Sequence, residues 1–377
     1  MSTLRTVSTG RTPKPSRVAP ALAVLVAVVF SSAGCAAGAP SAVSTRPAAA
    51  GTATAPKTGE PEVITTGLAA PWSIAFLSDG TPIVSERDSD RILELDASGR
   101  AREVGVIDGV TGDGEGGLLG LAVDGNDRLY AYSTGGGGNR IQRLDVAGEP
   151  GSLSLGEPET ILDGIPAAGN HNGGRIAFGP DGMLYATAGD AGDASSAQDP
   201  ESLAGKILRM TPDGDVPGDN PFPDSLVFSL GHRNPQGIAW SEDGTMFATE
   251  FGQDTWDELN VIEPGENYGW PDVEGIAGSG DFADPEQQWS PDDASPSGMA
   301  IIDDTLYLAN LRGRVLRTVD AAAPTDFADL FAGDFGRLRD AVAAPDGSLW
   351  ILTNNTDGRG TPGEGDDRIV RVPVVAG

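Results

Sequence analysis

The stretch GGRIAFGPDGMLYATAGD, residues 173–190, contains two short apolar segments joined by Pro-Asp-Gly. Asp-Gly readily supplies the positive-φ conformations of a tight β-turn, so this stretch is predicted to form a β-hairpin. The same arrangement recurs in PWSIAFLSDGTPIVSE from Pro71, GLLGLAVDGNDRLYAYS from Gly117, PQGIAWSEDGTMFATEFG from Pro235, PSGMAIIDDTLYLANL from Pro296 and LRDAVAAPDGSLWILTNN from Leu338. The chain is therefore expected to be a series of repeated β-hairpins.

A third strand-like segment follows each hairpin. These segments are RILELD at 91, RIQRLD at 140, KILRMT at 206, DELNVI at 257, RVLRTV at 314 and RIVRVP at 368. Six units of roughly 53 residues suit an all-β, six-bladed β-propeller with four-stranded blades. The last unit lacks a strand that residues 61–66, PEVITT, can supply, so the N- and C-terminal strands are predicted to pair and close the ring. Separate small β domains are the alternative, but the spacing leaves no linkers between units.

The N-terminal region differs from the rest of the chain. Residues 1–34 have a basic head and a short apolar run, Val18 to Phe30, which is typical of a secretory signal peptide. The run ends at Cys35, the single cysteine, which resembles the lipid-attachment cysteine of bacterial lipoproteins; cleavage without lipidation is the alternative. Residues 35–60, rich in Ala, Pro, Ser, Thr and Gly, predict a flexible tether to a propeller domain over 61–377.

The charge balance limits the partners. The chain has 25 Lys and Arg against 55 Asp and Glu, a formal net charge of −30. Such a surface repels nucleic acid and anionic lipid, so no nucleic-acid partner is expected. We expect an exported protein in the cell envelope, in contact with the membrane only through a lipid anchor on the outer face of the cytoplasmic membrane.

Two kinds of loop share one face of a propeller: those that lead into the first strand of a blade and those that join its second and third strands. Polar residues in these loops are expected to meet at one mouth of the channel; they are Glu115, His171, Asp190, Arg233, Asn234, Glu258, Arg312, Arg337 and Arg339. The four arginines would repel one another unless an anion lay between them, so a bound polyanion is expected. Pairing with local carboxylates such as Asp340 is the alternative.

His171 is the candidate general base, because an imidazole can take a proton at neutral pH. Asp190 is the candidate carboxylate for its other ring nitrogen. A structural role for His171 is the alternative. His232 is expected to be structural, because Arg233 and Asn234 share its tight turn.

The stretch DELNVIEPGENYGWP, residues 257–271, is dense in oxygen ligands. Glu258 and the neighbourhood of Tyr268 could hold Ca²⁺, which prefers carboxylates and backbone carbonyls. An ordinary acidic loop is the alternative. No cysteine and histidine cluster in the sequence suits zinc.

Several motifs together resemble one family. GEGGLLGLA, HNGGRIAFGPDGMLY, AGKILRMTPDG, DNPF, GHRNPQGIAW, DELNVIEPGENYGWP and RLRDAVAAPDG are similar to the soluble sugar dehydrogenases that use pyrroloquinoline quinone (PQQ). These are the glucose/sorbosone dehydrogenase family and its aldose sugar dehydrogenase branch, and the resemblance runs from about Gly67 to Val370. It implies a six-bladed propeller in which His171 takes the proton of the sugar's anomeric hydroxyl and Asp190 orients that base.

The resemblance also implies the cofactors. PQQ, with three carboxylates, would lie among Glu115, Arg233, Asn234, Arg312, Arg337 and Arg339. One Ca²⁺ would bind the backbone carbonyls of Gly252 and Gln253, and another would bind Glu258 and the region of Tyr268. An aldose would be oxidised at C1 to a lactone, and an external acceptor such as a quinone, cytochrome or dye would take the electrons, since the sequence has no haem-attachment motif.

Two other functions fit the same fold. A metal-dependent hydrolase or lactonase would use carboxylates on a channel cation and has no need of an arginine cluster. A binding module without catalysis would have no need of His171 and Asp190. Both features therefore favour the dehydrogenase.

Overall fold

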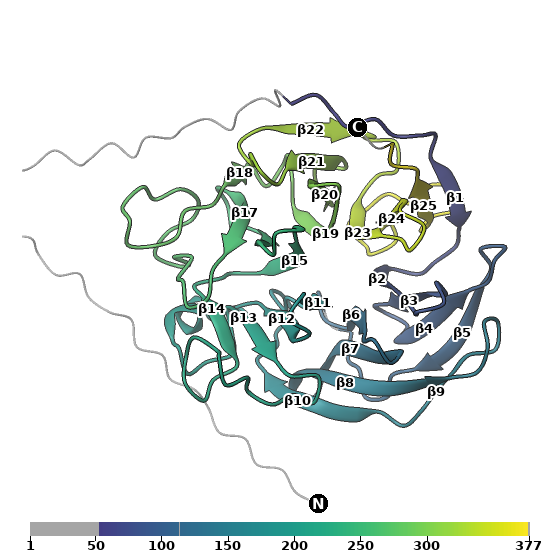
Figure 1. Cartoon of the computed structure of the whole chain (residues 1–377), viewed down its shortest axis with the longest axis horizontal. Coiled ribbons are helices and arrows are strands. Elements are labelled where there is room, and N and C mark those ends of the chain that lie inside the picture. The colour runs from purple at the N-terminus through teal and green to yellow at the C-terminus, as the bar shows by residue number, and fades with distance from the viewer. Residues whose placement is uncertain (1–52, 113, 376–377) are drawn as a thin grey trace, which may run out of the picture. The chain divides into compact units, whose positions relative to one another are not determined.

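The computed structural model describes residues 53–112 and 114–375, which form six antiparallel β-sheets arranged around a common axis (Figure 1). The predicted signal peptide (1–34), Cys35 and the first part of the predicted tether lie outside the described residues. Within the described part, no helix is long and apolar enough to cross a membrane.

The first sheet consists of β2 (Pro71–Phe76), β3 (Pro82–Glu86), β4 (Arg91–Leu95) and β5 (Ala101–Val106). The second consists of β6 (Leu118–Val123), β7 (Arg128–Gly135), β8 (Gly138–Ala147), β10 (Glu159–Ile165) and the short β9 (Ser154–Leu155). The third consists of β11 (Ile176–Phe178), β12 (Leu184–Ala188), β13 (Lys206–Met210) and β14 (Val227–Leu230). The fourth sheet consists of β15 (Pro235–Trp240), β16 (Met246–Glu250), β17 (Asp257–Ile262) and β18 (Gln287–Trp289). The fifth consists of β19 (Pro296–Ile302), β20 (Thr305–Asn310), β21 (Leu316–Asp320) and β22 (Phe327–Leu330). The sixth consists of β23 (Leu338–Ala343), β24 (Leu349–Thr353), β25 (Ile369–Val372) and β1 (Glu62–Thr65). A 3₁₀ helix, η1 (Ala194–Gln198), precedes β13.

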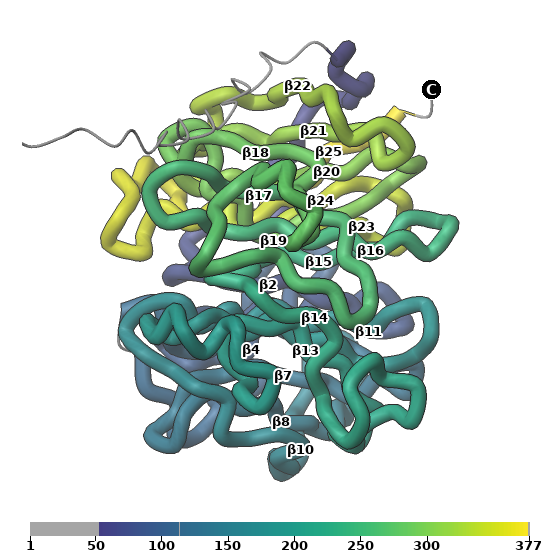
Figure 2. Tube along the Cα trace, turned by 90° about the vertical axis from the view of Figure 1, so that its left-hand side faces the viewer, coloured from purple at the N-terminus to yellow at the C-terminus, as the bar shows by residue number. Residues whose placement is uncertain are grey.

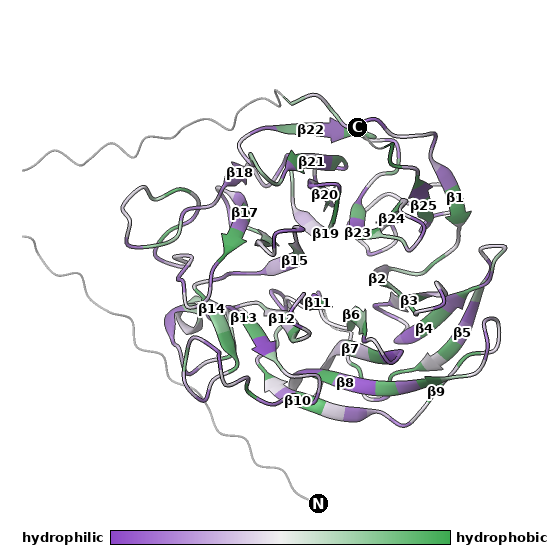
Figure 3. Cartoon of the chain, in the orientation of Figure 1, coloured by the Kyte–Doolittle hydropathy of each residue, from purple (hydrophilic) through white to green (hydrophobic). Residues whose placement is uncertain are grey.

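Each predicted hairpin is formed by the first two strands of a sheet. Between β11 and β12, Gly182 has a φ of +75°, and its N–H donates to the carbonyl of Gly179. The side chain of Asp181 accepts from the N–H of Met183 at 3.0 Å, so both residues of the Asp-Gly pair stabilise the turn. In Figure 3 apolar and polar bands succeed one another along β8 and β10.

The first strands form the innermost layer. Each contacts the next in the order β2, β6, β11, β15, β19 and β23, and β23 contacts β2 again. Figure 2, turned by 90°, places β8 and β10 on one side of these strands and β22 on the other. Apolar side chains fill the space between neighbouring sheets, as where Ile83 and Ile92 of the first sheet join Leu118 and Leu129 of the second. The predicted all-β, six-bladed propeller with four-stranded blades is confirmed.

The sixth sheet contains strands from both ends of the described chain. β1 is antiparallel to β25, with Val63 opposite Val370, which is the place the sequence assigned to residues 61–66. The pairing extends to residues 57–59, which the sequence assigned to the tether: the N–H of Gly59 donates to the carbonyl of Pro373 at 2.8 Å. Backbone pairing needs no apolar side chains, so composition alone did not indicate it.

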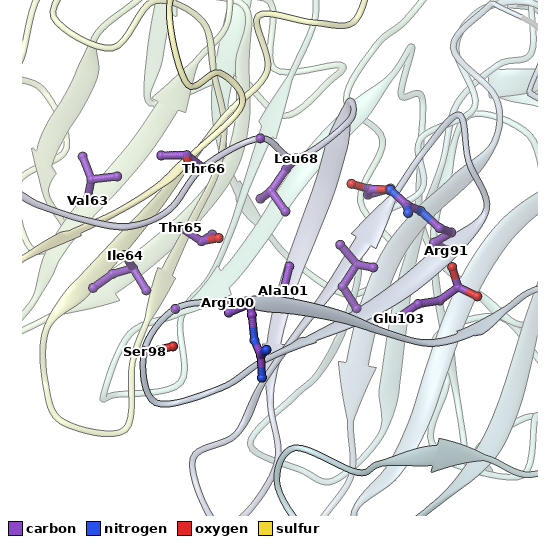
Figure 4. A pocket seen from close by; sticks show the side chains of 14 residues that line it. Val63, Ile64, Thr65, Thr66, Leu68, Arg91, Ser98, Arg100, Ala101 and Glu103 are labelled. Atoms are coloured by element: carbon purple, nitrogen blue, oxygen red, sulfur yellow. The ribbon is translucent and has the colours of Figure 1, made fainter.

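A cavity of about 690 Å³ lies where this sheet meets the first one (Figure 4). Residues 63–68 line it from the side of β1, and Ser98, Arg100 and Glu103 line it from the first sheet. Gly99 is the close contact of this seam, because a Cβ built on it would lie 1.8 Å from the carbonyl oxygen of Ile64.

We expect Gly99→Ala to lower the free energy of unfolding by about 1–3 kcal/mol more than Gly80→Ala, since overpacking carries costs of that size. Gly80 is the matched control: its φ of +86° is close to the +78° of Gly99, but a Cβ added to it would have no atom within 4 Å. Urea denaturation of the two variants measures the difference. Equal losses would show that the seam between β1 and the first sheet is not tightly packed.

Candidate active site

His171 lies in the loop that leads into β11, and the local sequence explains its backbone. Its φ is +56°, a region in which histidine is enriched among non-glycine residues, and Gly173 and Gly174 follow with φ of +63° and +101°. The loop packs closely against its neighbours, because a Cβ on Gly173 would lie 2.5 Å from the carbonyl oxygen of Thr187. Glycine is therefore required after His171 both by conformation and by space.

His171 and Asp190 form a dyad. Nδ1 of His171 lies 2.7 Å from Oδ1 of Asp190, a residue that is only 1% exposed. The same oxygen accepts from the N–H of Gly192 at 2.7 Å, and Oδ2 accepts from Nε1 of Trp270 at 2.8 Å. Burial alone would raise the pKa of Asp190, but the hydrogen bonds from His171, Gly192 and Trp270 outweigh it and lower the pKa.

An ionised Asp190 places the imidazole proton on Nδ1 and leaves Nε2 as the acceptor. No residue of the described ranges is hydrogen-bonded to Nε2, and the His171 side chain is 13% exposed. The dyad can therefore take a proton from a molecule at the mouth of the channel. His232, in contrast, is fully buried between Ser229 and Glu250, as the sequence predicted.

Arg339 is buried close to the axis, and no carboxylate of the described residues forms an ion pair with it. It is 4% exposed, and its NH1 donates to Oε1 of Gln236 at 3.0 Å and to Oγ of Ser297 at 3.2 Å. Burial lowers the pKa of Arg339 to about 9, an effect that the attraction of Asp357 does not offset. A buried guanidinium whose pKa is lowered by burial is stabilised by any anion that binds beside it.

Arg233 also forms no ion pair with a carboxylate among the described residues. Its NH1 donates to the carbonyls of Phe251 and Gly252 at 3.0 and 2.8 Å. Asn234, next in the chain, is buried and accepts from the N–H of Gly173 at 3.0 Å through its side-chain oxygen. Asn234 thus connects the loop before β15 to the loop that carries His171, and Arg233 connects it to the loop after β16.

The other two predicted arginines have acidic partners. Arg337 pairs with Asp357 at 3.1 Å, and Arg312 forms an exposed ion pair with Asp292. Local pairing, the alternative considered for all four, therefore applies to these two. The partner is not Asp340, which pairs with Arg175 at 2.9 Å because its strand, β23, faces the axis.

Glu115 joins the dyad to a residue that the sequence did not single out. Its Oε2 accepts from the backbone N–H of His171 at 2.9 Å, and its Oε1 lies 3.1 Å from NH1 of Arg359. Glu115 and Arg359 line a small cavity of about 20 Å³. The other seven residues that line it are Trp72, Arg87, Asn172, Gly173, Gln236, Phe251 and Arg339. The structure thus brings Glu115 and Arg339 to one cavity, whereas no hydrogen bond or ion pair joins Arg312 to any other predicted site residue within the described ranges.

Sequence reasoning missed Trp72, Arg87, Trp270 and Arg359. Trp72 is the second residue of β2, the position that Arg339 has in β23, and that equivalence could have identified it. Arg87 directly follows β3. Arg359 lies in a glycine-rich loop with no motif of its own.

The predicted calcium ligands form two separate sets, Gly252 with Gln253 and Glu258 with Tyr268. The carbonyl of Gly252 accepts from NH1 of Arg233, and the N–H of Gln253 donates to Glu274. Glu258 and Tyr268 line one cavity with Glu250 and Glu274. Burial and the charge of Glu250 raise the pKa of Glu258 to about 8.

This second set is incomplete as a metal site. The hydroxyl of Tyr268 donates to the carbonyl of Val261 at 2.7 Å, so only its backbone is left as a ligand. Within residues 53–112 and 114–375, no three acidic, histidine or cysteine side chains are arranged to hold a metal ion. Backbone carbonyls would have to complete the coordination.

Comparisons with known proteins show the family to which the chain belongs. The family described as glucose/sorbosone dehydrogenase matches residues 68–364. The PQQ-bound aldose sugar dehydrogenase of Streptomyces coelicolor is 48% identical, with a TM-score of 0.80 over 85% of this chain and 100% of that one. An aldose sugar dehydrogenase of Escherichia coli is 30% identical over 81% of this chain and 92% of its own length. Quinoprotein glucose dehydrogenase B of Acinetobacter calcoaceticus is 31% identical over 59% of this chain and 54% of its own length.

Asp190→Asn should lower the free energy of unfolding more at pH 7 than at pH 3. The folded-state pKa of Asp190 lies below the usual 3.8, so its stabilising effect is complete above that value and disappears as the pH falls through the folded-state pKa. Asn has one acceptor oxygen and cannot serve both His171 and Trp270, which predicts a loss of about 1–3 kcal/mol at pH 7. Urea titrations at both pH values measure it, and a loss independent of pH would contradict the ionised dyad.

Proposed function

Because the chain belongs to the glucose/sorbosone dehydrogenase family, we propose that it oxidises an aldose at C1 to the lactone, with PQQ as cofactor and an external molecule as the final electron acceptor. The observation that carries this proposal is that the His171–Asp190 dyad lies beside Arg233, which, like the buried Arg339, forms no ion pair with a carboxylate among the described residues. Neither a hydrolase nor a passive binding module requires both features.

The residues at the mouth fit an anionic ligand rich in carbonyl groups. Nδ2 of Asn234 and the Nε atoms of Arg233, Arg337 and Arg339 are buried donors without a partner in the described part of the chain. Such donors are costly unless a ligand satisfies them. PQQ carries three carboxylates and two quinone oxygens, which are acceptors of the required kind. A ligand of this size would lie in the open mouth, because the enclosed cavity has room for about one water molecule.

When bound, PQQ supplies the acceptor for the two electrons that leave the sugar. The protein supplies the base: Nε2 of His171 takes the proton of the C1 hydroxyl. Asp190 keeps the other proton on Nδ1 and stabilises the imidazolium that results, because it remains ionised at neutral pH. The partly exposed imidazole can then release its proton to solvent.

The finer features of the proposal rest on the sequence. We propose that Ca²⁺ binds at Glu258 and the backbone of Tyr268, where a cation would offset the charge that raises the pKa of Glu258. We also propose that the protein is exported and lipid-anchored through Cys35, with a quinone or a cytochrome as the electron acceptor.

His171→Ala should abolish aldose oxidation while the protein still takes up PQQ. The physical reason is that His171 supplies the base, whereas the unpartnered donors belong to Asn234 and the arginines. Purified protein supplied with PQQ and Ca²⁺ is assayed by dye reduction with a panel of aldoses, and PQQ uptake is followed by absorbance. If the wild-type holoprotein reduces no dye with any aldose, a binding module is the better interpretation.

Arg339→Gln should weaken PQQ binding roughly tenfold to hundredfold, the usual effect of losing one hydrogen bond to a charged group. Arg100→Gln is the matched control, because it removes the same charge from an exposed arginine that pairs with Asp96. Titration of both variants with PQQ measures the ratio. Equal affinities would mean that the buried guanidinium does not contact the cofactor.

A further inference from the structure

Trp270 joins the two parts of the candidate active site. It lies between β17 and β18, and its Nε1–H donates to Oδ2 of Asp190 at 2.8 Å. Its ring faces the guanidinium of Arg233, whose Cζ is 5.5 Å from the ring centre. One side chain thus contacts both the carboxylate of the dyad and a cation of the predicted cofactor site.

The backbone of Trp270 is fixed on two sides. Its N–H donates to the carbonyl of Gly231 at 2.9 Å, and its carbonyl accepts from Nε2 of Gln198 at 2.7 Å. Gln198 belongs to η1 and also exchanges side-chain hydrogen bonds with Asn267. The backbone that carries the indole is therefore held in place independently of Asp190.

Asp190 depends on Trp270 in a specific way. Oδ1 receives the hydrogen bonds of His171 and Gly192, whereas Oδ2 receives only that of Trp270 from the described residues. Asp190 is nearly fully buried, so water cannot readily replace the indole. A hydrogen bond to Oδ2 withdraws negative charge from the carboxylate and so reduces its stabilisation of a protonated His171.

We propose that Trp270 is a positioning residue that limits the basicity of His171 through Asp190 and holds the guanidinium of Arg233 beside the dyad. The second role rests on the proposed function, because it concerns the cofactor. The first concerns a proton affinity that can be measured without any cofactor.

The other charged groups that face the dyad come from four loops. Glu115 accepts from the backbone of His171, and Arg359 pairs with Glu115. The carbonyl of Arg233 accepts from the N–H of Asp190, and the N–H of Asp193 donates to the carbonyl of Asp190. None of these groups donates to Oδ2, so none compensates for the loss of the indole N–H.

Trp270→Phe removes the N–H and keeps an aromatic face for Arg233. We expect the proton affinity of His171 to rise about tenfold, which corresponds to an increase of about one unit in its pKa. The chain has only two histidines, and the other is fully buried, so NMR titration of the imidazole signals in the full chain measures this directly. In the holoprotein, the acidic limb of the pH profile of kcat should move to higher pH by the same amount.

Trp350→Phe is the matched control, because Nε1 of Trp350 has no partner among the described residues and its ring packs on Phe76 in another blade. It should leave the titration of His171 unchanged. Trp270→Leu removes the ring as well, and should also weaken PQQ binding, whereas Trp270→Phe should not.

An unchanged His171 pKa in Trp270→Phe, with the fold intact by circular dichroism, would overturn the inference. If that variant unfolds, Gln198→Ala loosens Trp270 without touching the dyad and should raise the pKa by a smaller amount; no change there would also overturn it. A shifted pKa in a protein that oxidises no aldose would instead contradict the proposed function and leave the positioning role intact.

Discussion

One buried ion pair crosses the axis of the propeller and connects sheets that are far apart in the ring. Arg175, at the start of β11, lies 2.9 Å from Asp340 on β23. Asp340 also accepts from the N–H of Ile74 on β2, and Nε of Arg175 donates to the carbonyl of Gln236 on β15. Removing either charge would leave the other buried and unpaired, which costs several kcal/mol. The ion pair and these two hydrogen bonds thus link four sheets at the axis.

The ion pair also determines which arginine near the axis has a carboxylate partner. The guanidinium of Arg175 lies 4.3 Å from the ring centre of Trp72, and that of Arg339 lies 5.6 Å from the same centre. Arg339 additionally shares Gln236 with Arg175, but no carboxylate is left for it among the described residues. The axis therefore holds one neutralised cation and, beside it, one cation without a counter-ion. An anionic ligand is the simplest way to satisfy the second.

Most of the fold was predictable, because short apolar segments joined by a tight turn act locally and recur in each unit, with Asp-Gly in five of the six turns and Asp303-Asp304 in the other. The dyad was predictable for a related reason: His171 and Asp190 flank the same hairpin, so the hairpin brings them together. The arginines were harder. Loop position specifies the face of the disc but not the distance from the axis, and thus Arg339 is buried near the axis whereas Arg312 is exposed and paired with Asp292. Trp270 was missed because its motif was interpreted only as a source of metal ligands.

The orientation of the His171 ring depends on three neighbouring sheets and not on its own loop alone. Glu115, before β6, holds the backbone of His171, and Asp190, after β12, holds its ring. Trp270, after β17, then holds Asp190. These residues belong to the second, third and fourth sheets, so a small rotation between neighbouring sheets would break hydrogen bonds of less than 3 Å. Three blades therefore restrict His171 to a single tautomer and a single direction.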